Sequence, residues 1–146
     1  MLETLIKELN DLLARYETLN KQHEEMKTRR KEMWTDDLFE WLHLNEKMWA
    51  LAVEGESLYN ELKRKLDIIK WDRKIELKDE VNDDGKKKYT ETTADAVIFK
   101  QFEDEDDALW KIRKVYKLIL NVKQNIPEYV NIVKMDIKNL TPLQWF

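Results

Sequence analysis

The chain has 146 residues, a formal net charge of −4, no cysteine, and only two glycines and two prolines. This length fits one domain. Glycine and proline are too few for the many tight turns of a sandwich or barrel, which excludes these folds. The lack of cysteine excludes disulfides, thiolate metal sites and a cysteine nucleophile. Charged residues make up 38% and hydrophobic residues 42%, a balance typical of a rod-like helical protein, because a thin bundle exposes much surface for each residue that it buries. The lack of cysteine suits a cytoplasmic protein.

The first predicted helix covers residues 1–34 and carries apolar side chains at alternating spacings of three and four. Such spacing keeps one stripe on one side of the helix, which is the signature of a coiled coil. A helix with so narrow a stripe needs a partner helix, either from the same chain or from a second copy. We take the stripe as a candidate seam between copies; its members are Leu2, Leu5, Leu9, Leu12, Tyr16, Leu19 and Met26.

The second predicted helix covers residues 36–79, after a break or bend at the sequence MWTDDLFEW. Thr35 is a candidate N-cap, and the two aspartates that follow it suit the positive end of a helix; one continuous helix through Trp34 is the alternative. Gly55 lies inside the second helix, either as a weak spot or as a close contact with another helix. Beyond Ile69 the pattern fits both a fraying helix and a short strand.

A polar linker is expected at residues 80–91, with Gly85 and three consecutive lysines. A third helix follows at 92–126, where Thr92 or Thr93 caps its start. Pro127 should end or kink that helix, a short helix should follow at 128–140, and Pro142 should stop it. The predicted fold class is all-α: a single domain over 1–146, built as an elongated bundle of three long helices plus a short C-terminal helix.

The sequence shows no recognisable catalytic, cofactor or metal site. His23 and His43 lack the HExxH spacing of a zinc helix, and His23 falls in the first stripe, where a polar residue that sets the register is more usual. The acidic run at 103–107 lacks the spacing of a calcium loop or of a di-iron bundle. No phosphate-binding glycine loop is present. We therefore expect a protein that is not an enzyme and has no cofactor and no metal.

No membrane association is expected. The first 19 residues carry charges throughout, unlike a signal peptide, and no apolar run approaches the length of about 18 residues that a spanning helix needs.

Lysines and arginines alternate with tryptophan and tyrosine in KWDRK at 70–74 and in WKIRKVYK at 110–117, and further basic clusters lie at 63–65 and 86–88. Cations neutralise phosphates and flat rings stack on bases, so this mixture is typical of proteins that bind single-stranded nucleic acid. In the alternative interpretation, the aromatic rings point into the core and the lysines only keep the surface soluble.

In the middle of the chain a lysine-rich helix, NELKRKLDIIKWDRKIEL, leads into the polar linker KDEVNDDGKKKYT and then into a helix that begins at ETTADAVIFKQFEDEDDALW. This order of elements resembles the phage UvsY-like recombination mediator family. The resemblance covers roughly residues 58–126. It implies an all-helical homo-oligomer that binds single-stranded DNA without sequence preference and helps to load a recombinase onto strands coated by a single-strand-binding protein, in the cytoplasm of the host if the protein is phage-encoded.

By position, the resemblance implies a nucleic-acid-binding set made of Lys63, Arg64, Lys65, Lys70, Arg73, Lys74, Lys86, Lys87 and Lys88. Two hypotheses therefore follow from the sequence. The first is a DNA-binding accessory protein of recombination. The alternative is a structural or protein–protein interaction module that self-assembles through coiled-coil helices and binds no DNA.

Overall fold

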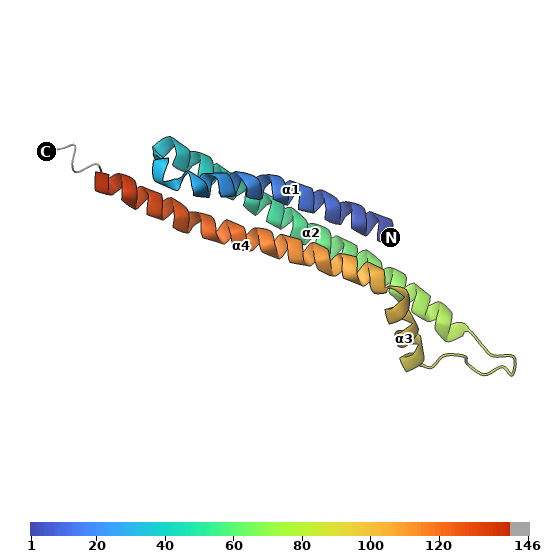
Figure 1. Cartoon of the computed structure of the whole chain (residues 1–146). Coiled ribbons are helices and arrows are strands. Elements are labelled where there is room, and N and C mark those ends of the chain that lie inside the picture. Colours follow the sequence, from blue (N-terminus) through green and yellow to red (C-terminus); the bar gives the residue numbers. More distant parts are fainter. Residues whose placement is uncertain (141–146) are drawn as a thin grey trace.

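Three long helices lie side by side and form an elongated bundle, shown by a computed structural model that describes residues 1–140 (Figure 1). The elements are α1 at Leu2–Thr28, a short 3-10 turn at Arg30–Glu32, α2 at Thr35–Asp79, α3 at Glu91–Gln101 and α4 at Glu103–Leu140. Helices α1 and α4 run in the same direction and α2 runs opposite to both (Figure 1). The predicted all-α class is confirmed, and the predicted stop at Pro142 lies outside the described residues.

The first joint lies where the sequence predicted it, between α1 and α2. The continuous-helix alternative is wrong, because α1 ends at Thr28 and a 3-10 turn separates it from α2. Thr35 is the first residue of α2 rather than its cap. Trp34 holds the cap position, and its backbone N–H donates to the Asp37 carboxylate at 2.9 Å. The aspartate therefore binds a backbone group at the helix start in addition to meeting its positive end.

The second half of the chain corrects the predicted order of long and short helices. The short helix is α3, and it precedes the long α4 instead of following it. Helix α3 is capped by Thr90 rather than Thr92 or Thr93: the Thr93 N–H donates to the Thr90 hydroxyl at 3.2 Å, and the Thr90 N–H donates to the Thr93 hydroxyl at 2.8 Å. The chain then turns at Phe102, whose side chain is buried in the core.

Helix α4 continues through Pro127, so the predicted end at this residue is wrong. A proline inside a helix costs about 3 kcal/mol. The side chains of Ile126, Val130 and Val133 on either side are buried, and each such burial contributes roughly 1.5–3 kcal/mol. Packing therefore outweighs the cost of the proline.

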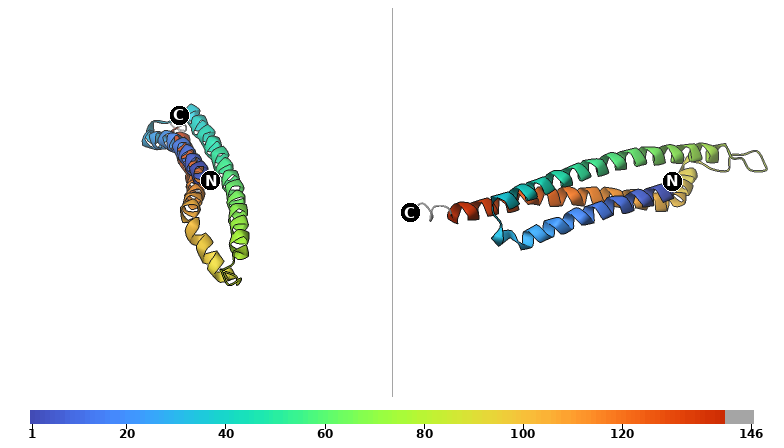
Figure 2. Two further views of the ribbon diagram at one scale, coloured as in Figure 1. Left: turned by 90° about the vertical axis from the view of Figure 1, so that its right-hand side faces the viewer. Right: turned by 90° about the horizontal axis from the view of Figure 1, so that it is seen from above.

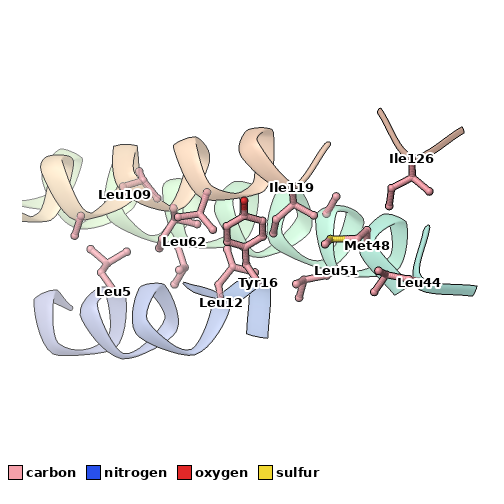
Figure 3. Close-up of a cluster of buried hydrophobic side chains, with 14 of the residues drawn as sticks. Leu5, Leu12, Tyr16, Leu44, Met48, Leu51, Leu62, Leu109, Ile119 and Ile126 are labelled. Atoms are coloured by element: carbon pink, nitrogen blue, oxygen red, sulfur yellow. The ribbon is translucent and has the colours of Figure 1, made fainter. Parts of the chain in front are cut away.

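The core is a line of apolar side chains from α1, α2 and α4 (Figure 3). Leu5, Leu12, Tyr16 and Met26 of the predicted seam are buried in it, and Leu2, Leu9 and Leu19 are partly buried against it. The partner helices of the stripe thus belong to the same chain. The assignment of the four buried side chains to a seam between copies is corrected, since a second copy has no access to them.

Gly55 marks a close approach of α2 to α4. A Cβ at this position would lie 2.8 Å from Tyr116 Cβ on α4 and 3.3 Å from Leu12 Cδ2 on α1. The close-contact interpretation is therefore confirmed, since any larger side chain at this position would press against Cβ of Tyr116, which is fixed to the α4 backbone.

The last turns of α2, the link and α3 project beyond the N-terminal end of α1 (Figures 1 and 2). Helix α2 stays helical to Asp79, which resolves the ambiguity beyond Ile69. The link is a tight turn: the Asn82 N–H donates to Lys86 O at 2.7 Å, and Gly85 adopts a φ of 79°, which favours glycine. Within the described part of the chain, no helix combines the length and the apolar character needed to cross a membrane.

Candidate nucleic-acid interface

Six of the nine sequence-predicted cations already have a carboxylate partner. Lys63 and Lys65 pair along α2, whereas Lys70 and Lys74 reach across to the acidic starts of α4 and α3. A carboxylate within about 4 Å offsets much of the attraction that a cation exerts on a phosphate. The pairs are Lys63–Asp67, Lys65–Glu61, Lys70–Asp106, Arg73–Glu76, Lys74–Asp95 and Lys88–Glu80.

The side chains of Arg64, Lys86 and Lys87, by contrast, form no ion pair with any other residue of the described range 1–140. Arg64 shares the outer face of α2 with Trp71, seven residues later, and with Lys78, after another seven. The Trp71 ring is 62% exposed, so the interpretation that the tryptophans point into the core is wrong for it. Lys78 was missed by sequence reasoning, although its spacing of seven from Trp71 could have shown it.

The surroundings of this stripe are nevertheless acidic. Residues 60–107 contain eleven lysines or arginines but fifteen aspartates or glutamates. Residues 108–140, in contrast, contain seven lysines or arginines and two aspartates or glutamates. The positive charge that is not compensated locally therefore belongs to α4.

One face of α4 combines cations with an exposed ring, and we call it the α4 basic face: Trp110, Arg113, Lys114 and Lys117. Their spacings of three, four and seven place them on one side of the helix. No acidic residue occurs from 110 to 127. Arg113, Lys114 and Lys117 form no ion pair within residues 1–140, Lys114 Nζ lies 4.4 Å from the centre of the Trp110 ring, and that ring is 52% exposed.

A second exposed ring, which belongs to α2, lies beside another cation of α4. Lys123 Nζ is 5.1 Å from the centre of the Trp49 ring of α2. A cation over an aromatic face is held by the ring quadrupole and still presents its charge to solvent. The predicted nucleic-acid-binding set contains none of the residues of the α4 basic face. The signal for this face was nevertheless visible in the sequence, as a run without acidic residues that begins at a tryptophan.

His23 lies away from any open site, in the core between α1, α2 and α4. Trp41 Nε1 donates to His23 Nδ1 at 3.0 Å, and the Tyr129 ring lies edge-on to the imidazole. Burial lowers the pKa of His23 because it disfavours the charged form. The imidazole is thus a neutral hydrogen-bond acceptor that positions Trp41.

The acidic run at 103–107 contains two residues that pair with lysines. Asp106 binds Lys70 of α2, and Asp107 binds Lys111 one turn later at 2.9 Å. Over residues 1–140 no three His, Asp or Glu side chains lie close enough together to hold a metal ion. The four acids of the first turn also lie at the positive end of the α4 dipole, where negative charge stabilises a helix.

Comparisons of the chain with protein-family models, with curated proteins and with solved structures give no match.

Proposed function

We propose that the protein is a non-enzymatic accessory protein that binds single-stranded DNA along the α4 basic face. The observation that carries the proposal is the unpaired state of Arg113, Lys114 and Lys117 beside the exposed ring of Trp110. In binding, the cations neutralise phosphates and release counterions. The ring offers one base a stacking surface worth roughly 1–3 kcal/mol, whatever the base is.

The residues predicted from the sequence should contribute unequally to DNA binding. Arg64, Lys86 and Lys87 remain candidate phosphate contacts outside the α4 basic face, because each keeps its charge free. The six paired cations contribute less, since a phosphate must first displace a carboxylate. A long strand that engages both α4 and the outer stripe of α2 would bind more tightly than a short one.

A further role rests on the resemblance to recombination mediators alone. In this role the protein helps, in the cytoplasm, to load a recombinase onto strands coated by a single-strand-binding protein. It adds two protein partners to the proposal. Pull-down of the protein by a recombinase filament on single-stranded DNA tests that role separately from DNA binding itself.

Fluorescence anisotropy with a labelled oligo-dT strand tests the proposal. The double substitution Arg113→Glu, Lys117→Glu should raise the Kd by about tenfold or more, and the salt dependence should weaken by about 0.7 for each lost phosphate contact. The matched control is Lys63→Glu, Lys65→Glu, which makes the same change of charge on paired lysines of α2 and should change the Kd less than about threefold.

Two results would contradict the proposal. One is the absence of binding by the unmodified protein at low salt and tens of micromolar. The other is an equal loss for both double variants, since that would show a dependence on total charge and not on a surface.

The second candidate function, a self-associating interaction module, is favoured by a different observation. Apolar side chains line an open groove between α1 and α4. The buried members of the predicted seam cannot serve this module, but the groove can, and it includes Leu2 and Leu9 of that seam.

A further inference from the structure

A continuous apolar groove runs between α1 and α4. It consists of a hollow of about 470 Å³ and a smaller one of about 280 Å³ that share Leu9 and Lys111. Ile6 on one wall and Leu118 on the other are each 44% exposed. The apolar lining is Leu2, Ile6, Leu9, Leu13, Val115 and Leu118.

The charges at the two ends of the groove have opposite signs. Asp104 and Asp107 line the end near the start of α4, whereas Lys114 and Lys117 line the other end. Ten residues separate the two pairs along α4, which corresponds to about 15 Å. The groove thus has apolar walls, a negative end and a positive end, and Lys111 near its middle is bound to Asp107 at 2.9 Å.

We propose that this groove binds a second copy of the same chain in antiparallel orientation, which goes beyond the DNA-binding proposal. A twofold interface must be complementary to itself, so that residue i of one copy contacts residue j of the other and the reverse. With the axis near Leu9 and Lys111, the acidic end of each copy meets the basic end of its partner, and the leucines of both copies meet between them. Each Lys111 near the axis keeps Asp107 of its own copy as its ion-pair partner.

The charge pattern selects a second copy over other occupants. An acidic amphipathic helix would suit the lysines but would be repelled by the aspartates. A basic helix would meet the opposite problem. Only an occupant with both signs in reversed order satisfies both ends, and an antiparallel copy of the groove has this order by symmetry.

The size of the groove predicts a weak dimer. The strip from 104 to 121 is about 26 Å long and two helices about 20 Å wide, so a pair of copies buries on the order of 1,000 Å² in total, the lower limit of specific interfaces. Analytical ultracentrifugation of the unmodified protein, which measures its mass in solution, should therefore cover protein concentrations of roughly 1–200 µM. Over this range the mass should rise from the monomer value of 17.8 kDa toward twice that value.

Two oppositely charged variants test the orientation. The acid-reversed variant carries Asp104→Lys and Asp107→Lys, and the base-reversed variant carries Lys114→Asp and Lys117→Asp. Each variant alone places like charges at both ends of the interface, so each should remain monomeric. When they are mixed, both ends become attractive, so an equimolar mixture should dimerise at least as well as the unmodified protein.

Recovery in the mixture cannot arise from misfolded variants, and equal helicity by circular dichroism confirms that each variant folds. A monomeric unmodified protein at the highest concentration would overturn the proposal. So would dimers of either variant alone, or a mixture that stays monomeric.

Failure of this proposal is distinguishable from failure of the proposed function. The acid-reversed variant keeps every cation of the α4 basic face. It should lose self-association while it still binds oligo-dT, and association of the unmodified protein is measured without nucleic acid.

Discussion

Replacing Gly55 with alanine sets helix propensity against packing in the centre of the bundle. In an exposed part of a helix, Gly→Ala stabilises by about 0.8–1 kcal/mol. In this protein the new methyl group would lie 2.8 Å from Tyr116 Cβ. That atom is fixed to the backbone of α4 and cannot rotate away, and Leu12 Cδ2 at 3.3 Å closes the other side.

The magnitude follows from the distance. Ordinary contact between carbon atoms needs about 3.5–4.0 Å, so α2 and α4 must separate locally by roughly 1 Å. Overpacking of this kind costs about 1–3 kcal/mol. After the gain in propensity, Gly55→Ala should destabilise the protein by up to about 2 kcal/mol, which lowers the Tm by up to roughly 7 °C for a chain of this size.

Urea unfolding followed by circular dichroism at 222 nm measures the effect as a shift of the midpoint. Asn60→Ala is the matched control, because Asn60 is exposed on the same helix and its replacement changes propensity alone. The control should gain a few tenths of a kcal/mol. If Gly55→Ala gained stability as well, the close approach of α2 to α4 at this point would be wrong.

Three further predictions concern single residues. Burial lowers the pKa of His23 below its unfolded value near 6.5. The contribution of the neutral imidazole to stability is therefore complete above about pH 6.5 and is lost as the pH falls toward the folded pKa, by at most about 1.4 kcal/mol per pH unit. The urea midpoints at pH 7.5 and pH 5.5 should differ less in His23→Phe than in the unmodified protein. Pro127→Ala should stabilise α4 by about 1–2 kcal/mol, because it restores one backbone hydrogen bond, and a lower urea midpoint would show that the proline fits a local bend. Trp110→Ala should weaken oligo-dT binding by roughly 1–3 kcal/mol, whereas Trp41→Ala, at a buried ring, should act on stability instead.

The helical class and the first joint could be predicted because they depend on local signals. The alternating spacing in residues 1–34 requires a helix, and glycine and lysine at 85–88 require a link. The turn at Phe102 carries no such signal, since no glycine or proline lies near it. The sequence could not show whether the first stripe pairs within the chain, because the same stripe suits either partner.

Some ion pairs of the candidate site could be predicted from the sequence and others could not. The pairs Lys63–Asp67 and Lys65–Glu61 are four residues apart and could have been read from the sequence. Lys70 and Lys74 find their carboxylates on α4 and α3, about 20 to 36 residues away along the chain. Only the arrangement of the helices brings these groups together, so only the structure shows that most of the expected DNA-binding cations are neutralised.

The unpaired charge on α4 has a structural cause that links both proposals. Helix α2 carries acids of its own and lies next to the acidic first turns of α3 and α4, so most of its cations find partners. The middle of α4 instead faces the leucines of α1 across the groove, and none of the ion pairs within residues 1–140 joins α1 to α4. Its lysines therefore stay free for an external anion, which is a phosphate in one proposal and the aspartates of a second copy in the other. Because Lys114 and Lys117 belong to both surfaces, DNA and the second copy should compete, and added oligo-dT should shift the dimer toward monomer; a dimer that gains mass from bound DNA without dissociating would show that the two surfaces are separate.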